Sequence, residues 1–164
     1  MNEKERILTA LYAFVAQRPG LEYCNYGDPK TYRAELRAIT RDRHDAEALL
    51  RDIHYSSITA EELKDALRSA YSGRLEWDGK ELRYTTGQYF PTEYRRAVCA
   101  VAASALWQHV RDKSMPEPKY THYGSTNDRP MQTVATYNGL SAGDWLRKHF
   151  RQTYGRRLAK RWFD

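Results

Sequence analysis

The sequence predicts a mainly α-helical (α+β) fold, a single-domain helical bundle around a buried central helix with one β-hairpin. Its 164 residues, 41% of them hydrophobic, are enough to bury the core of one domain. Residues 97–107, AVCAVAASALW, are apolar or small on every side of a helix, which is typical of a helix buried all round. Residues 74–85 instead alternate around Asp78-Gly79, as the strands of a hairpin do.

Three helices are predicted before the hairpin. The first covers residues 3–17, with Asn2 as its cap. The second begins with Pro29, a position where proline costs no hydrogen bond. Its apolar stripe fits one long helix or two helices broken near residues 40–42. A capping box, Thr59–Glu62, opens the third helix.

Charge pairing sets the register that we predict for the hairpin. A two-residue turn would place Glu76 opposite Glu81, and like charges directly opposite each other destabilise a strand pair. A four-residue loop, residues 78–81, avoids this repulsion. It pairs Trp77 with Leu82, Glu76 with Arg83 and Leu75 with Tyr84. We therefore predict the longer loop.

The second half of the chain is predicted to hold the central helix, a loop and a basic helical end. The central helix covers residues 91–113. Residues 114–140 contain three prolines and two glycines without a sustained period, which predicts a long irregular loop. Ser141 then caps the basic C-terminal helices, residues 141–164, which Gly155 breaks or bends.

The whole net charge of the chain, +6, lies near its end. Residues 145–164 hold seven Lys or Arg and one acid, whereas residues 1–144 hold twenty bases and twenty acids. Such an asymmetry predicts an acidic partner, which is a nucleic acid, a nucleoprotein complex or an acidic protein surface.

The C-terminal segment combines these bases with an apolar stripe. The stripe recurs at every fourth residue: Leu146, Phe150, Tyr154, Leu158 and Trp162. The basic residues between its members are Arg147, Lys148, Arg151, Arg156, Arg157, Lys160 and Arg161. The stripe would anchor the segment, while the bases would contact phosphates and release their counterions. The competing interpretation is a solvated face whose bases favour helix C-termini.

Tyrosine is the dominant aromatic residue, with 13 Tyr against 4 Phe. Tyr120 and Tyr123, in the predicted loop, are candidates for stacking or interface contacts, because tyrosine offers a flat ring and a hydrogen-bonding hydroxyl. The alternative role for each is half-buried packing.

The chain contains none of the common catalytic or metal-binding motifs, so we expect a binding protein rather than an enzyme, without cofactor or metal. The alternative is a small metal-dependent nuclease or hydrolase. It would use His109, Asp112, His122 and Asp128.

Two further polar features are expected to be structural. Asp42 and Asp45, three residues apart, share one face of a helix from which His44 points away. Cys99 lies in the apolar run and is predicted to be a small core residue, although a disulfide with Cys24 stays open.

Three segments resemble small proteins encoded by tailed phages and related mobile elements: NYGDPKTYRAEL, GQYFPTEYRRAVCAVAASALW and GDWLRKHFRQTYGRRLAKRWFD. Such proteins are often host-takeover or anti-defence factors, including anti-CRISPR proteins, or helpers in phage DNA metabolism. The resemblance implies a phage-type accessory protein in the cytoplasm of the host cell, and it assigns no catalytic residue. Together with the basic end, it predicts binding to nucleic acid or to a nucleoprotein complex, with inhibition of a host defence such as CRISPR as one role.

Overall fold

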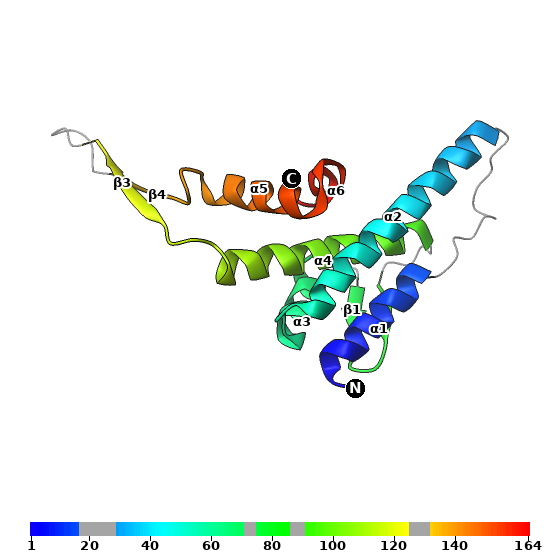
Figure 1. Cartoon of the computed structure of the whole chain (residues 1–164). Helices are drawn as coiled ribbons and strands as arrows, with labels where there is room; N and C mark the ends of the chain where they lie inside the picture. The colour runs from blue at the N-terminus through cyan, green and yellow to red at the C-terminus, as the bar shows by residue number, and fades with distance from the viewer. Residues whose placement is uncertain (17–28, 71–74, 86–90, 125–131) are drawn as a thin grey trace. The chain divides into compact units, whose positions relative to one another are not determined.

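The computed structural model describes residues 1–16, 29–70, 75–85, 91–124 and 132–164 of the chain. Within them the fold is mainly α, with six helices and two antiparallel hairpins, which confirms the predicted fold class (Figure 1). The helices are α1 (Glu3–Ala16), α2 (Pro29–Tyr55), α3 (Ala60–Ser69), α4 (Pro91–Lys113), α5 (Ala142–Tyr154) and α6 (Arg156–Trp162). The strands are β1 (Leu75–Trp77), β2 (Leu82–Tyr84), β3 (Lys119–Tyr123) and β4 (Gln132–Thr136).

Residue contacts divide the chain into two compact units, residues 1–106 and 107–164. The first unit holds α1, α2, α3, the β1–β2 hairpin and most of α4. The second unit holds the end of α4, the β3–β4 hairpin, α5 and α6. Across the described segments, we find no helix whose length and apolar character would let it cross a bilayer.

The helices of the first unit begin where the sequence predicts. The Asn2 side-chain oxygen accepts a hydrogen bond from the Glu5 amide at 2.8 Å and so caps α1. Thr59 and Glu62 form the reciprocal hydrogen bonds of a capping box at the start of α3. The second helix, α2, is continuous from Pro29 to Tyr55, so the alternative of one long helix is correct.

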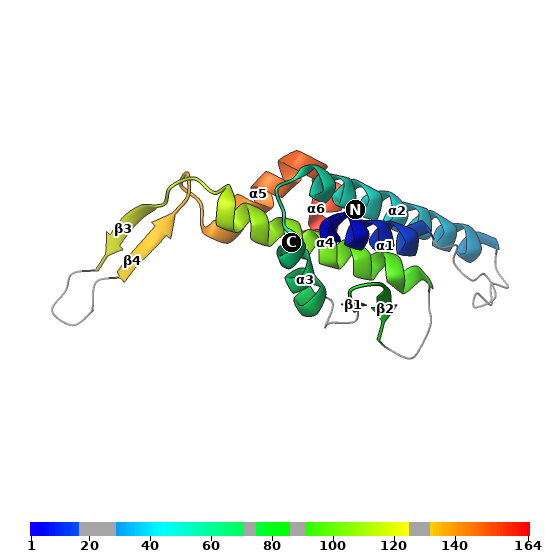
Figure 2. The ribbon, with the colours of Figure 1, turned by 90° about the horizontal axis from the view of Figure 1, so that it is seen from below.

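The core of the first unit forms where α1 packs against α2 and α3, and hydrogen bonds from Arg95 and Cys99 link α4 to α1 and α2. Figure 2 shows α1, α2 and α4 side by side. Leu11, Leu50, Ile53 and Leu63, from three different helices, have no solvent exposure. Each such side chain contributes about 1.5–3 kcal/mol on burial. These contacts hold the unit together without any disulfide or metal among its described residues.

The long helix α4 is buried as the sequence predicts. Val98, Cys99, Val101 and Ala102 all have no exposure. Cys99 is a free thiol in the core, and its Sγ donates to the Asp42 backbone oxygen at 3.5 Å. Cys24, with which a disulfide was left open, lies outside the described residues.

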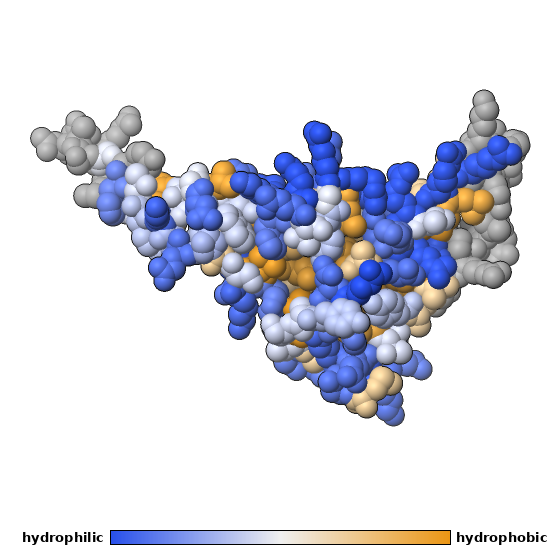
Figure 3. Space-filling model, in the orientation of Figure 1, coloured by the Kyte–Doolittle hydropathy of each residue, from blue (hydrophilic) through white to orange (hydrophobic). Residues whose placement is uncertain are grey.

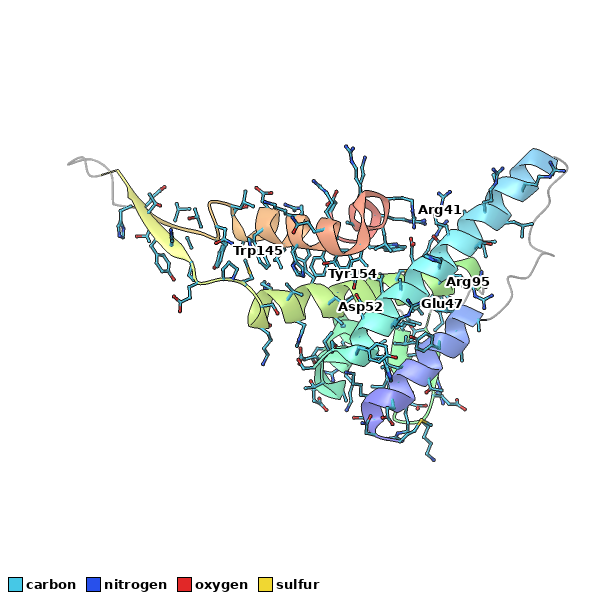
Figure 4. All side chains as sticks on the ribbon, viewed as in Figure 1. Arg41, Glu47, Asp52, Arg95, Trp145 and Tyr154 are labelled. Atoms are coloured by element: carbon cyan, nitrogen blue, oxygen red, sulfur yellow. The ribbon has the colours of Figure 1, made fainter. Side chains whose placement is uncertain are left out.

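Polar side chains also enter the interior of the first unit. Asp42 and Asp45 of α2 are both buried, which confirms that they share one helix face, and His44 is exposed. Arg95 of α4, only 2% exposed, donates through Nε to the Val15 backbone oxygen at 2.9 Å. Burial lowers the pKa of Arg95, and the negative charge of Asp42 opposes that shift. Figure 4 shows Arg95 of α4 close to Glu47 of α2.

The β1–β2 hairpin has the register predicted from charge pairing. Leu75 pairs with Tyr84, Glu76 with Arg83, and Trp77 with Leu82. The Asp78 carboxylate accepts hydrogen bonds from the amides of Lys80 and Glu81 at 2.8 and 2.7 Å, and these bonds lower its pKa. The Asp78 side chain therefore closes the loop of residues 78–81, and the predicted four-residue loop is confirmed.

The prediction of an irregular loop over residues 114–140 is wrong for residues 119–123 and 132–136, which form strands. Strands β3 and β4 pair in antiparallel register, with Thr121 opposite Val134 at the centre. KYTHY and QTVAT are rich in aromatic and β-branched residues that favour strands. The prolines at 116 and 118 precede β3 rather than interrupt it, so their disruptive influence was overestimated. The described residues thus contain a second hairpin that the sequence interpretation did not include.

Candidate nucleic-acid interface

The C-terminal segment forms two short helices that meet at Gly155. The Ser141 hydroxyl accepts from the Asp144 amide at 3.2 Å and caps α5, as predicted. Gly155 has a φ of +85°, a conformation that costs glycine little, and it ends α5 and begins α6. The predicted break is confirmed, and it divides the basic residues between two helices.

Three members of the predicted apolar stripe are buried, since Leu146, Phe150 and Leu158 are 1%, 2% and 6% exposed, whereas Tyr154 and Trp162 are half-buried. Phe163, just after α6 and outside the predicted stripe, is 4% exposed. The rings of Phe150 and Phe163 stack with centroids 3.9 Å apart and planes 2° apart. Trp107, at the end of α4, stacks on Phe150 at 5.8 Å. Because each such pair adds about 0.5–1.5 kcal/mol to plain burial, the two helices are firmly mounted in the second unit.

The basic residues lie on the opposite, solvent-exposed side of the same helices, which we call the basic face. All seven predicted members are exposed: Arg147, Lys148, Arg151, Arg156, Arg157, Lys160 and Arg161. Figure 3 shows strongly hydrophilic side chains that project into solvent at the position of α6. The structure therefore combines a buried set of stacked rings with seven exposed cationic side chains. Among these, Arg147 pairs with Asp144 at 3.3 Å, and the Arg161 guanidinium lies over the Trp162 ring.

Helix electrostatics explain only part of this face. Arg151 in the last turn of α5, and Lys160 and Arg161 in the last turn of α6, occupy positions where a cation stabilises a helix. Arg156 and Arg157 begin α6, where cations are unfavourable and no acid is present. The interpretation of a merely solvated face therefore accounts for three of the seven residues and conflicts with two.

The hairpin residues predicted to stack are arranged on β3. The side chain of Tyr120 is 63% exposed. The backbone of Tyr123 pairs with Gln132, and its side chain lies outside the described part. Tyr120 shares one face of the ribbon with His122, whose Nδ1 lies 3.1 Å from the Thr133 hydroxyl. Tyr120 is therefore available for a stacking contact, as the sequence analysis suggested.

The structure describes three of the four residues named for the alternative, a metal-dependent nuclease or hydrolase. His109 and Asp112 lie on α4, where Asp112 pairs with Arg111 at 3.3 Å, and His122 lies on β3. Asp128 is outside the described residues. Over the described ranges, no group of three His, Cys, Asp or Glu side chains is placed to share a metal ion.

Sequence reasoning missed two ring-bearing residues of α5. Trp145 and His149 stack with centroids 5.3 Å apart and planes 10° apart. Both are half-buried, and burial lowers the pKa of His149. Trp145 and His149 are four residues apart and each directly precedes a member of the apolar stripe. This i, i+4 spacing could have identified them as a stacked pair from the sequence.

Comparison of the chain with protein-family models, with curated proteins and with solved structures gives no match. The functional argument therefore depends on the geometry and charge of the second unit.

Proposed function

We propose that the protein binds nucleic acid, free or within a nucleoprotein complex, through the basic face of α5 and α6. The observation that carries this proposal is the exposure of seven cationic side chains on helices whose opposite side is anchored by stacked rings. Clustered cations on a positioned surface gain affinity for a polyanion because they release its condensed counterions.

The charges of the second unit favour a polyanion over a small acidic ligand. This unit has 11 Lys or Arg and 5 Asp or Glu, an excess of six cations within 58 residues. Only a partner with many regularly spaced negative charges would neutralise such an excess along two consecutive helices, and a phosphate backbone has this property.

The resemblance to small phage proteins adds a biological role to this proposal. We propose that the nucleic acid is presented by a host defence complex, such as a CRISPR effector, and that the protein blocks that complex. The protein acts by binding in this account, and no catalytic step is required of it.

A charge-reversal variant tests the binding proposal. Arg156→Glu/Arg157→Glu is compared with the matched control Arg33→Glu/Arg37→Glu, which reverses two exposed arginines of α2 in the first unit. Fluorescence anisotropy with labelled 30-nucleotide single strands and duplexes, at low salt, measures affinity. We expect the first variant to lose about 100-fold or more in affinity and the control to stay within about 3-fold of wild type. Equal losses in both variants, or no binding by the wild type, would refute the proposal.

Two further measurements separate the partners. Pull-down from a host lysate, with and without nuclease, distinguishes nucleic acid from an acidic protein surface, because partners retained after nuclease would identify a protein surface. In cells, expression of the chain should restore the transformation of a plasmid that a CRISPR system targets. The Arg156→Glu/Arg157→Glu variant should not restore it, and restoration by the variant would separate the defence role from the basic face.

A further inference from the structure

A small hollow opens in the second unit beside α5, and we call it the α5 hollow. Its volume is about 260 Å³, at or below the lower end of the range for drug-sized ligands, so it suits an occupant the size of a single base. It is lined by Asn138, Leu140, Trp145, Lys148, His149 and Gln152. Figure 4 shows Trp145 near the start of α5.

Aromatic rings form part of the wall of the α5 hollow. The indole of Trp145 and the imidazole of His149 stack on each other with planes 10° apart, so a base in the hollow would extend that stack on an outer ring face. Flat rings of this kind bind nucleobases of any sequence, because every base has a π-face. Burial lowers the pKa of His149 and so favours the neutral imidazole, which has one donor and one acceptor nitrogen.

Polar side chains at the rim of the hollow match the edge of a base. Asn138 and Gln152 each carry an amide with donors and an acceptor, the groups that pair with base edges. Asn138 is held by a tight turn in which Tyr137 and Leu140 exchange backbone hydrogen bonds of 2.7 and 3.0 Å. Its φ of +50° and that of Gly139, +82°, are those of a primed hairpin turn.

Lys148 connects the α5 hollow to the basic face. It lines the hollow and is also one of the seven exposed bases of the basic face. A strand whose phosphates lie along that face can therefore place one of its bases in the hollow. In a duplex the base faces are stacked and the pairing edges are occupied, so this geometry requires an unpaired base.

We propose that the α5 hollow binds one base of a single-stranded nucleic acid, stacked on the Trp145–His149 wall, while Lys148 and the basic face hold the flanking phosphates. This inference rests on the proposed function and specifies its substrate class as single-stranded DNA or RNA.

Oligomers that differ only in their bases test the inference. Oligothymidylate of 12 nucleotides, its uridylate counterpart and a 12-unit abasic oligomer of the same charge are titrated against the protein at low salt. Because stacking of one base has a large effect on affinity, we expect the wild type to bind the base-bearing strands about 10-fold more tightly than the abasic one. Trp145→Ala should abolish that preference and leave affinity for the abasic oligomer within about 2-fold.

Two further variants keep the test decisive. Asn138→Gly removes the amide but suits the left-handed backbone, so it should reduce the preference without disturbing the fold. Tyr55→Ala removes a ring of α2 that is 81% exposed and neither lines the hollow nor belongs to the basic face or its apolar stripe, and it should keep the preference. Circular dichroism confirms that each variant is folded.

Three outcomes would overturn the inference, and they are distinguishable from failure of the proposed function. The first is equal affinity of the wild type for base-bearing and abasic strands. The second is an equal loss for both strands in Trp145→Ala, and the third is loss of the preference in Tyr55→Ala. If one of these occurs while Arg156→Glu/Arg157→Glu still abolishes binding, nucleic-acid binding by the basic face is supported and base binding by the α5 hollow is refuted. If the wild type binds no oligomer, both fail.

Discussion

The two units of the chain use charge in different ways. The first unit has 16 Lys or Arg and 16 Asp or Glu, while the second has 11 and 5. In the first unit, Lys64 Nζ lies 2.6 Å from a Glu3 carboxylate oxygen and 2.9 Å from one of Glu61, and Arg95 is buried near Asp42. In the second unit, the cationic side chains outnumber the carboxylate side chains by six. Charge is therefore balanced within the first unit, and the excess positive charge of the chain lies in the second, where we propose that it binds a partner.

The largest expected effect concerns the stacked rings that anchor α5 on the side opposite the basic face. Phe150→Ala should lower the free energy of unfolding by about 3–5 kcal/mol, because it removes a fully buried ring that stacks on both Phe163 and Trp107. Urea denaturation followed by tryptophan fluorescence measures the change. Tyr120→Ala, which removes an exposed ring of the same unit, should change it by less than about 0.5 kcal/mol. A small loss of unfolding free energy in Phe150→Ala would mean that these stacked rings do not anchor α5.

A buried arginine tests whether charge in the first unit serves folding. Arg95→Ala should cost about 2–3 kcal/mol, because it removes the buried guanidinium that donates to the Val15 backbone oxygen and leaves that carbonyl without its side-chain donor. The adjacent Arg96 is the matched control, since its side chain is 48% exposed and its Nε lies 3.4 Å from Asp42. Arg96→Ala should cost at most about 1 kcal/mol. Thermal denaturation compares the two, and similar costs would weaken the distinction between buried and surface charge.

The start of α6 offers the reverse test in the second unit. Arg156→Glu should raise the free energy of unfolding by about 0.3–1 kcal/mol, because an acid at a helix N-terminus is favourable and a base is not. The same variant should weaken nucleic-acid binding. A variant that is more stable but binds less would separate function from folding at one residue. A clear loss of stability would instead show that Arg156 has a structural role.

The smallest expected effect is a pH dependence in the first unit. The Lys64 ammonium lowers the pKa of Glu3 below its usual 4.5, so the folded state releases that proton more readily than the unfolded chain does. The contribution is present above pH 4.5 and is lost as the pH falls through the lowered pKa. Glu3→Gln should therefore reduce the acid sensitivity of the melting temperature between pH 5 and pH 3. An unchanged pH profile would show that the pair adds nothing to stability.

Much of the fold could be predicted because the relevant interactions are local. The Thr59 capping box, the Ser141 cap and the break at Gly155 depend on residues within a few positions of one another. The register of β1 and β2 followed from opposing charges such as Glu76 and Arg83. The basic face and its apolar stripe were also predictable, because a helix alone places residues four apart on one side.

The parts that were missed depend on contacts between segments that are distant in sequence. Arg95 reads as a surface residue, and only the meeting of α1, α2 and α4 buries it against the Val15 carbonyl. The β3–β4 hairpin was not predicted because the nearby prolines indicated a loop, although the β-branched residues of the two segments favour strands. The α5 hollow needs the turn at Asn138 to lie against Trp145 of α5, which no helical spacing reveals.

The salt dependence of binding tests the central claim most directly. If the seven basic side chains contact phosphates, the logarithm of the binding constant should fall against the logarithm of salt concentration with a slope of about −5 for single strands and about −6 for duplexes. Arg156→Glu/Arg157→Glu should flatten the slope by at least about 1, and Arg33→Glu/Arg37→Glu should leave it unchanged. A wild-type slope near zero, or the same slope in all three proteins, would contradict the assignment of the basic face as a phosphate-binding surface.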